Sequence, residues 1–309
     1  MDRAEAGSRK GHALSITVLV GVLVLALGSV TAVSVYLNRL NSAVEAMATG
    51  QPPLDYPGRP GKPVVNGVSP LDFLVWVTDS DQKLLSVQLV HLSAGRDQLG
   101  VIGLSADLAA GADDADAVPL RRIYAEDPLL AGRQVEQLLD VRIDHLARVG
   151  LDSFDAVVEA LGGLGLPASA ARGSTDMGGV EGWVSAAPDA TARVERISGV
   201  VTETVTRLGM GQAMLNPMQF DRVLHAIEHC VVIDSAVRPG ELESVLVESK
   251  VRADEVTAVT LPTSALPGAD ARRADPTQLA ALRAALAADE VAGFGRPIAQ
   301  STPAVSPKR

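Results

Sequence analysis

The longest apolar run of the chain lies near its start. Residues 14–37 hold 24 consecutive positions without a charged side chain. At about 1.5 Å per residue, a helix of this length crosses a hydrocarbon core of about 30 Å. A cleaved signal peptide would have a shorter apolar run that ends at a site of small residues, and residues 31–34 (TAVS) match such a site poorly. We therefore expect one uncleaved N-terminal transmembrane helix over 14–37.

The charges beside this run predict its orientation. Arg3, Arg9 and Lys10 precede it, whereas only Arg39 follows closely. Positive residues tend to stay on the cytoplasmic side. Residues 1–13 are thus expected to be a cytoplasmic tail, and the protein is expected in the cell membrane as a single-pass protein whose C-terminal domain is extracytoplasmic. The Pro and Gly density of residues 51–63 predicts an extended linker over 38–68.

Periodic structure begins near residue 70. Continuous or alternating apolar runs predict strands at 73–77, 87–92, 99–104, 231–233 and 256–261. Apolar residues at helical spacing, several preceded by a capping Asp, predict helices at 128–139, 154–161, 189–208, 217–229 and 276–286. Strands interleaved with helices predict an α/β fold, a layered α-β-α domain with a central mixed sheet, over 69–290. Residues 291–309 are expected to be a disordered tail.

Composition excludes several functions. The net charge of −10 opposes a nucleic-acid surface. The one cysteine, Cys230, cannot form an internal disulfide, and its apolar neighbours indicate a buried small hydrophobe rather than a nucleophile. His225 and His229 share one helix face, but no third ligand is visible, so the sequence does not support a zinc site.

Two adjacent segments resemble a known family. Residues 141–149 read VRIDHLARV, and residues 154–164 read FDAVVEALGGL. They are similar to a strand and a following helix of the LytR–CpsA–Psr family of cell-envelope proteins, and the likeness runs from about 69 to 289. The resemblance implies proteins that attach glycopolymers to peptidoglycan. Such proteins move a sugar phosphate from a polyprenyl-pyrophosphate carrier with the help of Mg²⁺.

The resemblance also implies site residues. Asp79 matches the family's first metal-binding Asp, and Lys83 stands in place of an Arg that contacts phosphate. Arg193 and Arg196 match the two arginines of a family motif. They lie in the first turns of an expected helix, whose positive end favours anions. The alternatives are a solvated face for the two arginines and a turn-capping role for Asp79.

Other charges of the family pattern are replaced. The second metal carboxylate falls on Leu85, a phosphate-binding Arg on Ala106, and a Gln on Ile197. A further Arg pair falls near Ser185 and Ala187. Asp107 is kept, and we expect it to be structural. The Mg²⁺ that the resemblance implies therefore retains one expected carboxylate, Asp79.

Three functions follow from these observations. The first is a phosphotransferase with a reduced site built on Asp79, Lys83, Arg193 and Arg196, which should then converge at the mouth of one apolar cavity. The second is a non-catalytic relative that binds the polyprenyl lipid or polymer, or partners an active paralogue. The third is a transcriptional regulator, which the outward location and the acidic charge oppose. The expected partners are a polyprenyl-linked glycopolymer, peptidoglycan and the membrane.

Overall fold

The computed structural model describes residues 38–110, 117–164, 179–209, 217–238, 240 and 248–295. The expected cytoplasmic tail and transmembrane helix lie outside these residues. Within the described ranges, no helix is both long and apolar enough to cross a membrane.

A seven-stranded sheet forms the centre of the domain, in the order β1-β8-β7-β2-β3-β4-β9. Its strands are β1 (Ala48–Gln51), β2 (Leu71–Thr78), β3 (Leu84–Leu92), β4 (Leu99–Ser105), β7 (His145–Gly150), β8 (Val231–Asp234) and β9 (Val256–Thr260). Antiparallel pairs join β7 to β8 and run from β2 through β3 to β4, whereas the pairs β1–β8, β2–β7 and β4–β9 are parallel. The sheet is therefore mixed, as the sequence predicts.

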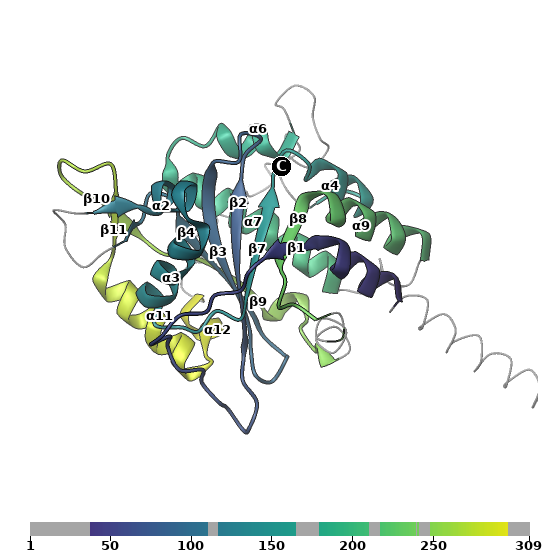
Figure 1. Ribbon diagram of the computed structural model, residues 1–309, viewed down its shortest axis with the longest axis horizontal. Coiled ribbons are helices and arrows are strands. Elements are labelled where there is room, and N and C mark those ends of the chain that lie inside the picture. The colour runs from purple at the N-terminus through teal and green to yellow at the C-terminus, as the bar shows by residue number, and fades with distance from the viewer. Residues whose placement is uncertain are drawn as a thin grey trace, which may run out of the picture.

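Helices cover both faces of this sheet (Figure 1). The helices α2 (Leu120–Glu126), α3 (Pro128–Leu139), α11 (Pro276–Ala288) and α12 (Val291–Gly295) contribute to one buried cluster. The helices α4 (Asp155–Ala160), α6 (Gly179–Ser185), α7 (Ala190–Gly209) and α9 (Pro217–Cys230) contribute to another. Two small hairpins, β5 (Ala109–Ala110) with β6 (Val118–Pro119) and β10 (Thr263–Ala265) with β11 (Arg272–Ala274), and the 3₁₀ turn Ala253–Glu255 complete the unit.

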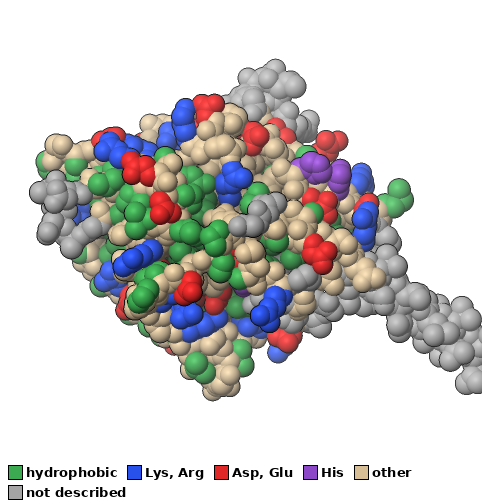
Figure 2. Space-filling model, viewed as in Figure 1, with side chains coloured by type: hydrophobic (Ala, Val, Ile, Leu, Met, Phe, Trp, Pro, Cys, Tyr) green, Lys and Arg blue, Asp and Glu red, His purple; other side chains and the backbone are tan. Residues whose placement is uncertain are grey.

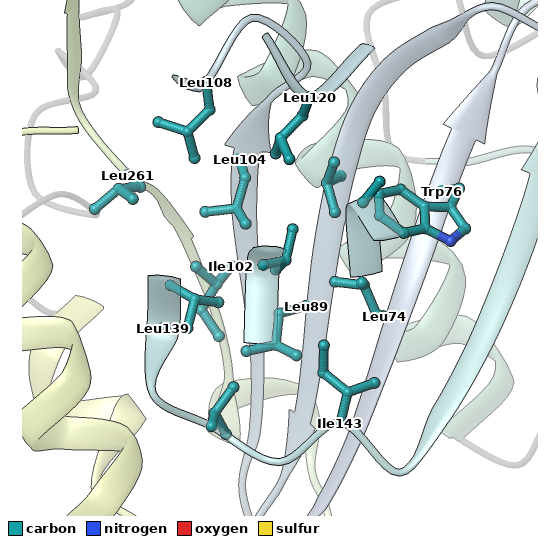
Figure 3. Close-up of a cluster of buried hydrophobic side chains, with 14 of the residues drawn as sticks. Leu74, Trp76, Leu89, Ile102, Leu104, Leu108, Leu120, Leu139, Ile143 and Leu261 are labelled. Carbon is teal, nitrogen blue, oxygen red and sulfur yellow. The ribbon is translucent and has the colours of Figure 1, made fainter. Parts of the chain in front are cut away.

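The cluster under α3 is the larger core. Figure 3 shows Leu74, Leu89 and Ile102 from neighbouring strands directed toward Leu139 and the other side chains of this layer. Trp76 is fully buried, and its ring centroid lies 5.1 Å from that of Tyr124 on α2. The continuous apolar runs of the strands are explained by this burial, because a sheet covered on both faces has no solvent-facing side.

The N-terminal segment differs from the expected extended linker. Residues 38–47 are helical, and β1 pairs in parallel with β8 at the edge of the main sheet. Arg59 forms an ion pair of 2.5 Å with the buried Glu136 and donates to the carbonyl of Ile143. Lys62 pairs with Asp144 at 2.6 Å. The Pro-rich stretch therefore lies along the domain, held by partners that are distant in sequence.

The last part of the domain also differs from expectation. Residues 291–295 form α12 rather than a disordered tail, because Val291 is buried against the sheet. A Cβ on Gly100 would lie 2.6 Å from Val291 Cγ1, so glycine at this position of β4 lets the helix approach. Residues 296–309 lie outside the described part of the chain.

Candidate functional site

Asp79 closes the turn between β2 and β3. Its Oδ1 accepts the backbone N–H groups of Asp81 (3.0 Å) and Lys83 (2.8 Å), while its own N–H donates to the Lys83 carbonyl. Gln82 in this turn has a φ of 62°. This geometry is that of a capping carboxylate, the alternative that the sequence left open for Asp79.

Lys83 points to solvent. Its Nζ lies 2.7 Å from Asp81 Oδ2, and both side chains are about 70% exposed (72% and 70%). The hydrogen bond and charge of Lys83 lower the pKa of Asp81, and those of Asp81 raise the pKa of Lys83. Such an exposed pair is screened by water and contributes little to stability.

The first turns of α7 carry the two candidate arginines. Asp189 precedes the helix, and its Oδ1 accepts the N–H of Ala192. Arg196 donates from Nη1 to the carbonyl of Trp183 on α6, and its guanidinium carbon lies 5.0 Å from the centroid of the Trp183 ring. Arg193 Nε is buried and has no hydrogen-bond partner among the described residues. A buried donor without a partner costs about 1–3 kcal/mol, which an anion could offset.

Helix α6 lies between the two pairs of candidate residues. Glu181 accepts from the N–H and the hydroxyl of Ser80, both at 3.0 Å, and so ties α6 to the turn of Asp79 and Lys83. Two residues on, Trp183 contacts Arg196. Residues two apart on a helix face different directions. The structure thus brings the turn and α7 to one region of the fold, but with α6 between them.

Apolar side chains fill the positions where the resemblance implies charge. Leu85 packs against the cluster that contains Ile197 and Val77. Ile197 is fully buried in that cluster, and Ala106 is buried in the other. Asp107 pairs with Arg121 at 2.7 Å, and Arg121 also contacts Asp270, so Asp107 has the structural role expected of it.

The donor set does not fit the Mg²⁺ that the resemblance implies. Magnesium is held by oxygen ligands, usually with carboxylates among them. Here Asp79 uses one oxygen for its own turn, and Leu85 offers no donor. In the described part of the chain, no three or more His, Cys, Asp or Glu side chains are grouped so that they could hold a metal ion.

A groove of about 620 Å³ between α4 and α9 was not predicted from the sequence. Its walls carry Asp152, Asp155 and Glu159 on one side and Arg222, His225 and His229 on the other. His229 Nδ1 donates to the carbonyl of His225 at 2.7 Å. The sequence signal for this groove is the spacing of the exposed polar residues on α9. The opposite wall of the groove comes from a segment some 70 residues earlier, and the sequence alone does not show that the two segments are neighbours.

Cys230 lies buried at the end of α9. Burial raises the pKa of its thiol to about 12, which leaves it protonated at neutral pH. Because the thiolate is the nucleophile, this confirms the interpretation of Cys230 as a buried small hydrophobe.

Comparisons with known proteins identify the fold. No protein-family model matches the sequence, and no curated protein sequence matches it. Solved structures do match. The LytR-Csp2A-Psr enzyme from Actinomyces oris is 16% identical, with a TM-score of 0.54, over 80% of this chain and 97% of that one. TagV of B. subtilis is 14% identical, with a TM-score of 0.58, over 72% and 97%.

Two further matches agree. TagT bound to LI-WTA is 12% identical, with a TM-score of 0.54, over 71% of this chain and 90% of that one. A transcriptional regulator from Enterococcus faecalis is 16% identical, with a TM-score of 0.55, over 74% and 93%. The chain therefore has a LytR–CpsA–Psr-like fold, as the sequence resemblance implies, and at these identities the likeness is one of fold.

Proposed function

We propose that this chain is a membrane-anchored, extracytoplasmic protein of cell-wall glycopolymer assembly that binds a polyprenyl-linked glycopolymer without transferring it. The observation that carries this proposal is the packing of Leu85 and Ile197 in one apolar cluster. The resemblance places a metal carboxylate and a polar amide at these two positions. In this chain Ile197 belongs to the buried cluster instead, and Leu85 packs against it.

The energetics oppose transfer. Phosphoryl transfer depends mostly on neutralising and positioning charge. Loss of one stabilising group typically costs about 10²–10³ in rate. Here Leu85 replaces a metal carboxylate and Ala106 replaces an arginine. The exposed Lys83 replaces a second arginine, whose planar guanidinium could form two hydrogen bonds to phosphate. Because several losses act on one transition state, we expect no turnover.

Arg193 supports retained binding of an anion. Its buried Nε has no partner among the described residues, and it lies in the first turns of α7, where the helix end carries partial positive charge. A phosphate of a polyprenyl carrier would satisfy this donor. One solved neighbour of the fold, TagT, has LI-WTA bound, so a protein of this fold holds a ligand.

The location is proposed from the sequence. The uncharged run over 14–37 is long enough to span a bilayer, and the charges before it favour a cytoplasmic N-terminus. The described domain would then meet lipid-linked glycopolymer and peptidoglycan outside the cell. A reporter fused to the C-terminus that is active only outside the cytoplasm tests this orientation, and an active cytoplasmic reporter would contradict it.

Binding can be tested on the full chain in lipid nanodiscs. We expect a polyprenyl-linked glycopolymer to bind, and Arg193→Ala to weaken its affinity about tenfold, the equivalent of one charge-assisted hydrogen bond. Arg238→Ala, at an exposed position, is the matched control and should leave affinity unchanged. Equal affinity of the two variants for the glycopolymer would show that Arg193 does not contribute to its binding site.

A further inference from the structure

Two helices lie side by side at one end of the domain. The structure describes the first from residue 38, which follows the expected transmembrane span in the sequence, and the second is α9, which starts at Pro217. Leu40 and Val44 share a buried cluster with Phe220 and Leu224. Arg39 and Asp221 form an ion pair of 2.5 Å near the two starts. Figure 1 shows both helices running inward from the same end of the molecule.

The exposed side chains at this end suit a lipid surface. Met218, in the first turn of α9, is 78% exposed, more than the other exposed large hydrophobic residues of the described chain. Arg222, one turn later, is exposed, and its Nε lies 3.4 Å from the Met218 carbonyl. Arg39 is 59% exposed. Figure 2 shows basic and apolar side chains together at this end, next to the purple histidines.

We propose that the first described turn of the helix at 38–47 and the start of α9 form a membrane-docking face. In this arrangement, Met218 enters the interface and Arg39 and Arg222 meet lipid phosphates. This inference rests on the membrane anchor of the proposed function. Its partner is the bilayer, because the 37 residues before Asn38 contain the expected span and join the domain at this face.

The chain geometry leaves little room for another arrangement. A helix rises about 1.5 Å per residue, so Arg39 lies only a few ångströms past the end of the expected span. Arg39 is paired with Asp221, which holds the start of α9 close to Arg39. A thioether in the interface is removed from water, and the basic side chain of Arg222 beside it gains from anionic headgroups.

The docking face also orients the groove between α4 and α9. Met218, Arg222, His225 and His229 follow one another at helical spacing along α9, and the last three line the groove. One end of the groove therefore opens toward the bilayer. In this arrangement the domain lies against the bilayer, whereas the extended linker that the Pro-rich sequence predicts would lift it off.

Site-directed spin labels test the face in the full chain. A Cys230→Ala background removes the native thiol, and single labels are placed through Met218→Cys and, as the matched control, Ser264→Cys. Ser264 lies exposed on β10, at the opposite end of the molecule (Figure 1). Vesicles contain phosphatidylglycerol, and circular dichroism verifies folding. We expect the label at 218 to be about threefold less accessible to an aqueous nickel chelate than the label at 264, and more accessible to oxygen.

The outcomes separate this inference from the proposed function. If the chain floats with vesicles but both labels are equally accessible to the chelate, the docking face is overturned and the anchor stands. If the chain does not float, the anchor and the docking face are both overturned, while glycopolymer binding by the domain is measured independently.

Discussion

At the scale of single residues, the most unusual group is His91, which is buried between two carboxylates. Its Nδ1 lies 2.8 Å from Asp72 and its Nε2 lies 2.9 Å from Asp289. A neutral imidazole has one N–H, so the second contact requires either a protonated His91 or a protonated Asp. In both assignments the cluster holds one proton more than a neutral imidazole with two ionised carboxylates. The cluster joins β2 and β3 to the end of α11.

This proton makes stability depend on pH. Burial lowers the pKa of His91, but hydrogen bonds to Asp289 and Asp72 outweigh this and raise it to about 9. Because the folded pKa is raised above the unfolded value of about 6.5, the stabilisation is complete below pH 6.5 and is lost as pH rises through 9. We predict that the free energy of unfolding, measured in urea, falls between pH 7 and pH 10.

The matching variant is His91→Asn. It leaves two buried carboxylates without their cation, which should cost about 3–5 kcal/mol at pH 6.5. The difference from the unmodified protein should shrink at pH 10. A difference that is constant over this pH range would show that His91 acts through packing alone.

Leu85 offers a second test at this scale. Leu85→Asp restores the carboxylate that the resemblance implies, but it places a charge against an apolar cluster. We predict a loss of about 1–3 kcal/mol in urea unfolding that Mg²⁺ does not reverse. Leu85→Met is the control and should cost less than about 1.5 kcal/mol. Recovery of stability with millimolar Mg²⁺ would indicate a latent metal site.

At the scale of elements, the placement of α7 depends on Gly103 in β4. A Cβ there would lie 2.4 Å from Ser198 Oγ and 2.6 Å from Val194 Cγ1. Ser198 also donates to the buried Gln88 on β3 at 2.9 Å. The missing side chain of Gly103 and this hydrogen bond hold α7, and with it Arg193, close to the sheet.

Gly103→Ala should therefore push α7 outward. We predict a loss of about 1–3 kcal/mol in thermal or urea unfolding and weaker glycopolymer binding. Gly199→Ala, on α7 itself, has open space around the new methyl group and should raise stability by about 0.5–1 kcal/mol. If both variants behave alike, contact between α7 and the sheet does not position the site.

Most of the helices and strands could be predicted from the sequence, but the contacts around the candidate site could not. Strands β2 to β4 and helices α3, α7 and α9 are predicted because each carries its own apolar pattern. The role of Trp183 and Glu181 is not predicted, because it depends on contacts of the short helix α6 with Arg196 and Ser80. The capping role of Asp79 was one of two alternatives, and the hydrogen bonds that show it depend on the geometry of the turn, which the sequence does not give.

At the scale of the whole molecule, the N-terminal segment joins both helical layers. The helix at 38–47 packs on α9, and Arg59 reaches Glu136 on α3. Glu136 also accepts the N–H of Ile143. Burial, together with the hydrogen bond and charge of Glu136, raises the pKa of Tyr56 to about 12. Such pairings span 77 positions and more, so the Pro-rich composition could not reveal them.

Arg59→Met should release this segment. We predict a loss of about 3–5 kcal/mol, because Glu136 is left buried and unpaired, and a smaller loss in the Arg59→Met/Glu136→Met double variant. Arg252→Met, which breaks an exposed pair with Asp254, should cost less than about 1 kcal/mol. Urea unfolding measures all three. Equal losses for Arg59→Met and Arg252→Met would show that the segment is held loosely.

The proposed role of the whole molecule, binding without transfer, is tested most directly by turnover. The full chain in nanodiscs is incubated with polyprenyl-linked glycopolymer, peptidoglycan and Mg²⁺, and release of polyprenyl phosphate is followed. We predict saturable binding of the glycopolymer and no release above that seen without protein. Release that depends on Mg²⁺ and is abolished by Asp79→Ala would contradict a non-catalytic role and assign transfer to this chain.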